Sequence, residues 1–356
     1  MAPRTKAAMI DALSAVAPGR PLRDGVDRIL QASMGALIVV GDGPDVLNIC
    51  SGGFLLDAEF SPPRLSELAK MDGAIILSAS ANRIARANVH LVPDPSVPTS
   101  ETGTRHRTAE RVARSIDVPV ISVSEDRAVI SVYRNNERHL LEAVPRLIAR
   151  SNVALQTLER YKQRMDAVAG TLTQLEVEDL VTVRDVVTLL QRAEMVRRIA
   201  EEIDGFVVEL GVDGLLIVLQ LEEMMAGVDD ERRAVVRDYS RNPTQARADD
   251  VVARLAGLST ERLLDLREVA SVLTGRADPA LDAGIQPRGY RLLSKVPRLP
   301  ESVLGHLVER FGTLPKILRA SMEDLDEVEG VGETRARSIK EGLARLVESS
   351  VLERLG

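Results

Sequence analysis

The 356-residue chain has one cysteine, no tryptophan, and aromatic residues at only 2% of its positions. A lone cysteine excludes an intramolecular disulfide and a cysteine-based zinc site, and it fits a protein of the reducing cytoplasm. We expect Cys50 to be a small buried residue of a strand. Scarce aromatics argue against nucleic-acid bases stacking on rows of rings. The cores must therefore be built from leucine, valine, isoleucine and alanine.

An excess of positive charge and long apolar runs are also missing. The formal net charge is −7, so any contact with nucleic acid must come from a local site. The start, MAPRTKAAMIDAL, has no apolar stretch long enough for a signal peptide. The most apolar run, Phe206–Leu221, contains Glu209 and Asp213 and is shorter than the ~20 residues of a membrane span. We expect a buried helix or helix pair there, and no membrane anchor.

The first region, residues 1–147, alternates helical and strand patterns. Apolar residues have helical spacing near the start, at Ile10, Leu13 and Val16, and helical patterns recur at 63–70 and 105–116. Short β-branched runs bounded by Gly, Pro, Asp or Asn predict strands at 36–40, 46–50, 74–78, 89–92, 118–123 and 128–133. This alternation predicts an α/β domain with a mixed sheet flanked by helices.

The rest of the chain loses the strand patterns. Residues 148–288 repeat apolar side chains at helical spacing, as in Leu180–Glu202 and Leu255–Leu273, and predict an all-α spacer. Its end, Ala277–Arg288, holds two prolines and a glycine, which favour a linker. Residues 289–356 predict a short all-α domain. The total length allows two or three domains of about 100–200 residues.

Two segments of the first region have both a structural and a binding interpretation. In Gly35–Gly41, GALIVVG, glycine lets backbone approach a ligand, but any buried α/β strand has this composition, and the structural interpretation is favoured. In Asp72–Gly73–Ala74, a carboxylate able to bind a divalent metal falls at the mouth of a sheet, where open α/β folds collect ligands. An ordinary Asp-Gly turn explains the second segment equally well.

The segment 99–111, TSETGTRHRTAER, gives the strongest local signal. A threonine hydroxyl can cap the helix that follows, and the start of a helix favours anions. Two arginines bracket a histidine in the first turn, and another hydroxyl follows. This set of groups suits a triphosphate, and we favour a phosphate site over the alternative interpretation, a solvated basic turn. The residues concerned are Thr102, Thr104, Arg105, His106, Arg107 and Thr108.

The known nucleotide motifs are missing. Nothing matches a P-loop or the protein-kinase motif set, so a nucleotide must be held in another way. Together, GALIVVG, Asp72–Gly73–Ala74 and Arg105–His106–Arg107 resemble the motifs of the diadenylate cyclase family, at matching separations. The DGA and RHR motifs do not depart from the family pattern. The domain order resembles that of members with a helical middle and a C-terminal helix-hairpin-helix domain, over essentially the whole chain.

The resemblance implies an enzyme that condenses two ATP molecules into cyclic di-AMP and releases two pyrophosphates. Two cyclase domains would face each other, so a homo-oligomer is required, and the family's octamer is expected. The implied cofactor is Mg²⁺ or Mn²⁺, held by Asp72, with His106 as a second metal or phosphate contact. Phosphate would be held by Arg105, Arg107 and Thr108, and the nucleotide pocket lined by Gly73, Ala74, Leu91, Thr104 and Ser124.

The third region contains DLDEVEGVGETRARSIKEG, which resembles a helix-hairpin-helix motif. Its glycines allow a tight turn, and N–H groups at the start of the second helix can bind a DNA phosphate. The stretch 299–312 is a degenerate match for a partner hairpin. From 287 to 356, 12 Lys/Arg and 11 Asp/Glu leave a balance of only +1, and an αα-hairpin used for packing is the alternative. The implied DNA-binding residues are Gly330, Val331, Gly332, Thr334, Arg335 and Arg337.

Three functions remain in competition. The leading hypothesis is a cyclase whose output depends on branched or junction DNA bound at the C-terminal domain, in a cytoplasmic, nucleoid-associated protein. A non-enzymatic scaffold would bind ATP without turnover, but it would not need the carboxylate of Asp72. A repair nuclease or ligase accessory is weaker, because the sequence has no clustered Asp/Glu/His pattern and no nucleophilic lysine motif.

Overall fold

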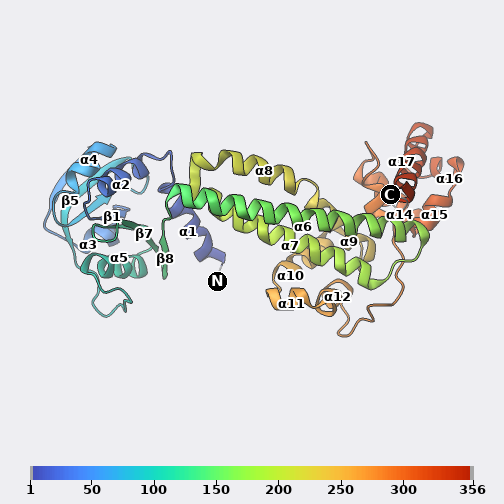
Figure 1. The fold of residues 1–356 in the computed structure, drawn as a ribbon, viewed down its shortest axis with the longest axis horizontal. Coiled ribbons are helices and arrows are strands. Elements are labelled where there is room, and N and C mark those ends of the chain that lie inside the picture. The colour runs from blue at the N-terminus through green and yellow to red at the C-terminus, as the bar shows by residue number, and fades with distance from the viewer. Residues whose placement is uncertain (1–2, 353–356) are drawn as a thin grey trace. The chain divides into compact units, whose positions relative to one another are not determined.

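The computed structural model describes residues 3–352; the outermost residues of the first and third predicted domains, 1–2 and 353–356, lie outside that range. The chain forms two compact units. The first contains the described residues up to 153 together with 202–219, and the second contains 154–201 and 220–352. Figure 1 labels many of the elements of both. The fold class predicted from the sequence, an α/β region followed by two helical regions, is confirmed.

The first unit is organised around a mixed sheet of eight strands in the order β2-β5-β4-β1-β6-β7-β8, with β3 paired to β5. Strands β1 and β4 at its centre run parallel, and their other neighbours are antiparallel. The strands are β1 (Ala36–Val40), β2 (Cys50–Ser51), β3 (Phe54–Glu59), β4 (Ala74–Leu77), β5 (Arg83–Leu91), β6 (Val120–Ser124), β7 (Val129–Arg134) and β8 (Glu137–Leu140).

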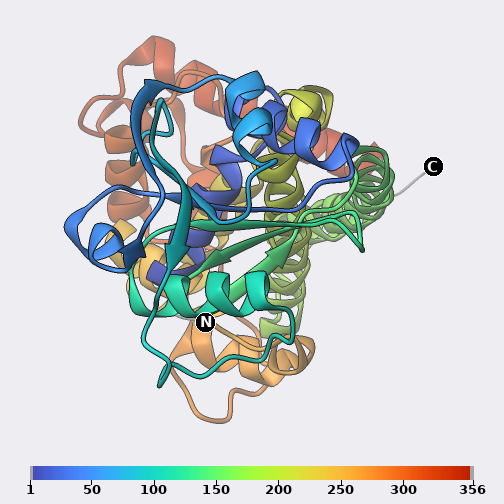
Figure 2. The ribbon, with the colours of Figure 1, turned by 90° about the vertical axis from the view of Figure 1, so that its left-hand side faces the viewer.

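Helices cover both faces of this sheet, so its central strands are buried on each side. Along β1, Ala36, Ile38 and Val40 pack in one core with helices α1 (Pro3–Ala15), α2 (Pro21–Gln31) and α4 (Pro62–Leu68). The intervening Leu37 and Val39 pack in a second core with α3 (Pro44–Asn48) and α5 (Thr104–Ser115). Figure 2 shows α5 running beside the sheet. Such two-sided burial explains why β1 is apolar without alternation.

One predicted strand is wrong. Residues 46–48 belong to helix α3, Ile49 is its C-cap, and only Cys50 lies in a strand, β2. Proline at the first helical position and Asp45 in the first turn favour a helix, and these signals outweigh the short apolar run. Cys50 is half-buried on an edge strand and its thiol contacts the carbonyl of Val46 at 3.2 Å, so it is less buried than predicted. Strands β3 and β8 were not predicted.

The apolar run 206–221 is a helix pair, as expected, but it is only partly buried: Leu210, Ile217 and Leu221 are 0%, 5% and 6% exposed. It contains the end of α7 (Val183–Leu210), a short 3₁₀ turn (Gly211–Gly214) and the start of α8 (Leu215–Met225). Leu215 and Leu216 are 62% and 74% exposed, because local apolarity does not specify which helix face another element covers. Within residues 3–352 we find no helix with the length and apolarity needed to cross a membrane.

The second unit is helical. Its long helices α6 (Val144–Glu178) and α7 begin in or extend into the first unit. The predicted linker 277–288 is irregular but is held by backbone hydrogen bonds to residues 181–184 at the start of α7, so it is not a free tether. The remaining helices are α9 (Val228–Tyr239), α10 (Gln245–Ala256), α11 (Thr260–Leu264), α12 (Leu266–Thr274), α13 (Tyr290–Leu293), α14 (Glu301–Phe311), α15 (Leu314–Arg319), α16 (Met322–Asp326) and α17 (Glu333–Leu352).

A buried arginine joins the C-terminal helices of this unit to its long helices. Arg291 in α13 is fully buried, and its guanidinium donates to Glu176 of α6 at 2.6 Å and to Glu231 of α9 at 2.7 Å. Two further hydrogen bonds reach the hydroxyl of Thr173 and the carbonyl of Ala169. Nearly every donor of the guanidinium is thereby satisfied, which is what a charge buried this deeply requires.

A buried carboxylate holds the same junction from the other side. Both oxygens of Asp238, at the end of α9, accept backbone N–H groups of Gly289, Tyr290 and Arg291 at 2.7–2.8 Å. These are the unpaired N–H groups at the start of α13, so Asp238 acts as a helix cap supplied by another helix. The orientation of α13 on α9 is therefore fixed by three charge-assisted hydrogen bonds.

We predict that Arg291→Met lowers the free energy of unfolding of the helical unit by about 3–5 kcal/mol, because it leaves the carboxylate of Glu176 buried without its cation. Arg310→Met is the matched control, since Arg310 pairs with Glu327 at 2.9 Å while 58% exposed, and its loss is expected to cost no more than about 1 kcal/mol. Denaturant unfolding followed by circular dichroism measures both. Equal losses in the two variants would show that the buried network does not hold the unit together.

Candidate active site

The predicted nucleotide residues lie at one end of the central strands. The register pairs Leu37 with Ala74 and Ala36 with Val123. Extending it by one or two residues places Gly35, Asp72 and Ser124 level with one another on β1, β4 and β6. In the same way, the pairing of Ala74 with Val89 brings Leu91 of β5 to the level of Asp72. Residues up to 89 positions apart in sequence thus share one edge of the sheet.

This edge is the amino end of the parallel pair β1 and β4, and the carboxyl end of β5 and β6. Ligands in open parallel sheets gather at carboxyl ends. Asp72 lies at a sheet mouth, as expected. It does not follow the carboxyl-end rule, however, because it precedes strand β4, and the carboxyl ends at this edge come from the antiparallel neighbours β5 and β6. Asp72 is exposed here, whereas the side chains of Ala74 and Leu91 are buried in the core shared with α5.

Gly73 has a conformational role of its own. Its φ of +112° lies in the region that favours glycine, and a Cβ there would be 2.8 Å from the carbonyl carbon of Asn88 and 3.0 Å from the amide nitrogen of Val89. The close neighbour is therefore the backbone of β5. The glycine allows β5 to pack against the segment that carries Asp72, and this accounts for it without a contact to a base or sugar.

Helix α5 brings the RHR segment to the same edge. Its N-cap is Gly103, so neither Thr102 nor Thr104 caps it as expected; Thr104 is the first helical residue and its carbonyl accepts the hydroxyl of Thr108 at 3.0 Å. Thr104 and Arg107 are exposed, and Arg105, His106 and Thr108 are half-buried. Glycine is an accepted N-cap residue, although it supplies no side-chain acceptor to the first N–H groups.

Arg105 packs directly on the start of β1. A Cβ on Gly35 would be 2.1 Å from Nη1 of Arg105, so the guanidinium occupies the space that any other residue at position 35 would fill. The sequence favoured a purely structural role for Gly35. The structure assigns this glycine a definite task, which is to admit the Arg105 side chain beside the edge that carries Asp72.

His106 is surrounded by groups that the sequence did not single out. Its Nδ1 lies 3.0 Å from the hydroxyl of Tyr133 in β7, and that hydroxyl donates to Glu101 at 3.0 Å. Burial lowers the pKa of His106, and nearby Arg138, Arg105 and Arg127 lower it further, while Glu101 acts in the opposite direction. The ring is therefore mainly neutral at neutral pH. In the sequence Tyr133 was part of an apolar strand run, and nothing distinguished it from core.

The residues at this edge can supply only a few protein ligands to a divalent metal ion. Among residues 3–352, no group of three or more His, Cys, Asp or Glu side chains is arranged to hold an ion. Asp72 offers an exposed carboxylate, which is a hard oxygen ligand. Mg²⁺ is commonly held by one or two carboxylates with substrate phosphates and water, so the residues present fit that mode of binding.

The glycine-rich segment of the third region forms a tight hairpin between α16 and α17. Gly330 has φ +81°, Val331 is buried, and Gly332 immediately precedes α17. The side chains proposed to contact DNA also have intramolecular partners: Arg335 donates to the carbonyl of Gly330, and Arg337 pairs with Glu333 at 3.2 Å. Thr334 is exposed at the start of the helix.

An earlier hairpin repeats this backbone 32 residues upstream. Arg298 has φ +62°, matching Gly330, and Pro300 precedes α14 as Gly332 precedes α17. Val296 and Val328, at matching positions, are both buried in the same core. The partner hairpin is thus centred on Arg298, slightly before the stretch expected from the sequence. Its degenerate sequence hid it, because only the backbone conformation is repeated.

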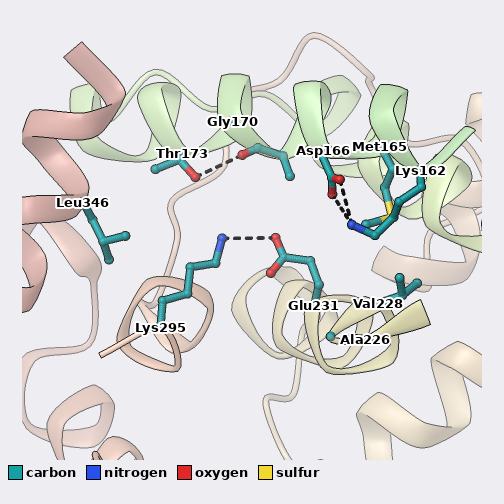
Figure 3. A pocket seen from close by; sticks show the side chains of 12 residues that line it. Lys162, Met165, Asp166, Gly170, Thr173, Ala226, Val228, Glu231, Lys295 and Leu346 are labelled. Atoms are coloured by element: carbon teal, nitrogen blue, oxygen red, sulfur yellow. Dashed lines mark hydrogen bonds and ion pairs between the residues drawn. The ribbon is translucent and has the colours of Figure 1, made fainter. Parts of the chain in front are cut away.

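The helical unit also contains a cavity of about 310 Å³ between α6, α9 and the C-terminal helices (Figure 3). Lys162 pairs with Asp166 at 2.7 Å, and Lys295 lies 3.5 Å from Glu231. These four charged groups neutralise one another in two pairs. The cavity therefore offers much less to a triphosphate than the edge near Arg105.

Comparison with known proteins places the chain in a family. Residues 23–138 match the family model described as DisA bacterial checkpoint controller nucleotide-binding, and residues 141–279 match the DisA bacterial checkpoint controller linker region. The chain is 58% identical to the DNA integrity scanning protein DisA of Frankia alni, over 96% of each chain. The chain belongs to the DisA family. The DisA protein of Streptomyces coelicolor is 55% identical, over 96% of this chain and 92% of that protein.

Membership of the DisA family confirms the expected enzyme class: the protein is a diadenylate cyclase, and its nucleotide-binding region is the α/β unit described above. Among solved structures, DacA from Staphylococcus aureus aligns at 24% identity over 39% of this chain and 90% of that chain. Its TM-score is 0.28. The nucleotide-binding model ends at residue 138, and the linker model begins at residue 141. The domain boundaries at 147 and 288, expected from the sequence, stay predictions.

We predict that Gly35→Ala lowers the rate of cyclic di-AMP formation by at least about tenfold, the equivalent of one lost hydrogen bond to a charged group, because the new methyl group displaces the guanidinium of Arg105. The fold should persist, since the displaced group is the end of a flexible side chain. Gly43→Ala is the control, because a Cβ there meets nothing within 4 Å. Initial rates and melting temperatures of both variants test this, and an unchanged rate in Gly35→Ala would contradict it.

Proposed function

We propose that the α/β unit condenses two ATP molecules into cyclic di-AMP in pairs of subunits whose site edges face each other. Each ribose 3′-oxygen forms a bond to the α-phosphorus of the other ATP. The bond from that phosphorus to the bridging oxygen breaks, pyrophosphate leaves, and the 3′-hydroxyl loses its proton. Because both nucleotides react in the same way, one site edge from each of two subunits suffices.

The observation that carries this proposal is the convergence of Asp72, Arg105 and the start of α5 at one edge of the sheet. A carboxylate, a guanidinium and free helix N–H groups are the groups that a metal-bound triphosphate needs. They derive from segments separated by more than 30 residues. Local turn chemistry explains each segment, but it does not explain why they meet.

We assign roles to the site residues on this basis. Arg105, Arg107 and Thr108, together with the helix start, hold phosphate oxygens and orient the α-phosphorus for attack. Asp72 holds Mg²⁺ or Mn²⁺, which when bound would neutralise phosphate charge and favour the ionised 3′-hydroxyl. His106 contacts a phosphate or the metal. The backbone at Gly73 and Leu91, with Thr104 and Ser124, lines the nucleotide pocket.

A homo-oligomer follows from this chemistry. One site edge binds one nucleotide, and the reaction joins two. We therefore propose face-to-face cyclase domains within a homo-octamer, the form that the family resemblance implies. Mass measurement of the full chain in solution tests the octamer separately from the chemistry.

We predict that Asp72→Asn abolishes cyclic di-AMP formation from ATP with either Mg²⁺ or Mn²⁺, because an amide is a poor ligand for a hard cation. ATP binding in the absence of metal should change little. Asp45→Asn serves as the control, since Asp45 is an exposed carboxylate in the first turn of α3, beyond the opposite end of β1. Product separation after incubation with ATP measures turnover in all three proteins.

Two outcomes would count against the proposal. If the assembled wild type binds ATP but forms no dinucleotide with either metal, the protein is a nucleotide-sensing scaffold. If Asp72→Asn retains the wild-type rate, the metal is held by other groups and the roles given above are wrong.

We also propose that the C-terminal helices bind branched or junction DNA, and that this binding lowers cyclase activity. The support is the hairpin 327–332, whose left-handed Gly330 directs the chain into α17 with N–H groups of Gly332, Glu333 and Thr334 at the start of the helix. Such a site binds phosphate and reads DNA shape instead of base sequence. Binding to DNA would also place the protein at the nucleoid.

The two hairpins differ at one informative position. Pro300 occupies the place of Gly332 and has no N–H group, so the first hairpin lacks a donor that the second offers. The first hairpin carries Val303 at the position of Arg335. We therefore assign the phosphate contact to the second hairpin, and a packing role to the first.

We predict that Gly332→Pro weakens junction-DNA binding about tenfold, because it removes one backbone donor, whereas Gly332→Ala, which keeps the N–H, binds like the wild type. The hairpin should tolerate both changes: Pro300 occupies the matching position, and a Cβ on Gly332 meets nothing within 4 Å. Junction DNA should lower the initial cyclase rate of the wild type and of Gly332→Ala more than that of Gly332→Pro. Equal DNA affinity in all three proteins would remove the hairpin from the DNA site, and tight binding with an unchanged rate would refute the coupling.

A further inference from the structure

A chain of three hydrogen-bonded groups leads from the body of the sheet to the RHR segment. Tyr133, 1% exposed in β7, has its hydroxyl 3.0 Å from Nδ1 of His106 and 3.0 Å from Oε1 of Glu101. The guanidinium of Arg138, in β8, lies 2.7 Å from the same carboxylate oxygen and 5.8 Å from the centre of the tyrosine ring. The phenol hydroxyl is thus placed between a carboxylate and an imidazole.

Proton counting fixes the direction of these hydrogen bonds. A carboxylate paired with arginine can only accept, so the single proton of the Tyr133 hydroxyl points to Glu101. Burial raises the pKa of Tyr133 well above its usual range, so the phenol keeps that proton. The hydroxyl then has only lone pairs for His106, and Nδ1 must donate to it. Whenever the imidazole is neutral, its bare nitrogen is Nε2.

The segment that carries Glu101 is anchored to helix α5. The segment before α5 is hydrogen-bonded to Glu110, a residue of α5 that is 7% exposed: its carboxylate accepts from the hydroxyl of Thr99 at 2.5 Å and from the amide of Ser100 at 2.9 Å. Although burial alone would raise the pKa of Glu110, these hydrogen bonds and Arg114 hold it below its usual range. Helix α5 therefore fixes the segment that precedes it. Glu101 of that segment in turn acts, through Tyr133, on His106 in the first turn of the helix.

We propose that Tyr133 and Glu101 are positioning residues that hold His106 with its proton on Nδ1, so that Nε2 presents a lone pair. Of the two contacts named for His106, this selects the metal, because a phosphate oxygen would need an N–H donor. The effect on the rate of cyclic di-AMP formation rests on the proposed function, whereas the effect on the tautomer of His106 does not. The nitrogen that carries the proton is set by the hydrogen bond of the other one. A ring with the proton on Nε2 would turn a donor toward a position that needs a lone pair, and loss of such a supporting contact costs about 10–100-fold.

The test uses the full-length protein and the variant Tyr133→Phe, which removes only the hydroxyl. Tyr161→Phe is the matched control, because Tyr161 lies on α6 in the helical unit. Two quantities are measured. The first is the tautomer of His106 in nucleotide-free protein, from ¹⁵N long-range correlation spectra in which the signal is assigned by its loss in His106→Gln; the chain has only four histidines. The second is kcat and KM for cyclic di-AMP formation.

We expect Tyr133→Phe to move the proton of His106 to Nε2 and to lower kcat by at least about tenfold, with KM for ATP within about twofold of the wild type. Glu101→Gln is the second variant. Its side chain keeps the shape of glutamate but no longer fixes the direction of the hydroxyl proton, so the same shift in tautomer should follow, even if Tyr133→Phe proves unstable. Tyr161→Phe should match the wild type in both measurements.

The proposal is overturned if Tyr133→Phe and Glu101→Gln keep the proton on Nδ1, whatever their rates. It is also overturned if the proton moves and kcat stays at the wild-type value, because the tautomer would then have no part in catalysis. If the wild type itself forms no cyclic dinucleotide, the proposed function fails, and the spectra of the nucleotide-free proteins still decide whether Tyr133 and Glu101 orient the ring.

Discussion

The parallel pairing of β1 with β4 is the constraint on which the candidate active-site edge depends. Because the two strands run in the same direction, the segments that precede them, Gly35 and Asp72, come to the same edge. Antiparallel β5 and β6 then bring their carboxyl ends, Leu91 and Ser124, to that edge. A shift of one residue in any of these pairings would reverse the faces of a strand and separate the groups.

Glycine at two positions makes the packing of this edge possible. Gly73 lets β5 approach the turn that carries Asp72, and Gly35 leaves room for the guanidinium of Arg105. Neither glycine needs a ligand to explain it, yet each places a charged group of the site. Close packing of backbone and side chain thus forms this edge in the nucleotide-free protein.

The helical unit depends on a different kind of interaction. Its C-terminal helices are attached through Arg291 and Asp238, two charged residues buried at the junction with α6 and α9. Apolar side chains would hold such a junction at a lower desolvation cost. Charged groups with fully directed hydrogen bonds instead define one orientation of α13 on the long helices. C-terminal helices held in one orientation can transmit the proposed DNA binding to the rest of their unit, which a flexible tether cannot do.

The sequence by itself determined the fold class, the positions of β1, β4 and α5, and the motif residues from Asp72 to Thr108, because periodicity and local motifs are carried by neighbouring residues. The short apolar run at 46–50 wrongly predicted a strand, since proline and aspartate at a helix start outweigh it. The apolarity of 206–221 did not reveal that only part of this run is buried. Nothing in the sequence connected Glu101, His106 and Tyr133. Only the tertiary structure decided that contact and the meeting of Gly35 with Arg105, because strand pairing and helix packing, which no local pattern encodes, bring distant residues within hydrogen-bonding distance.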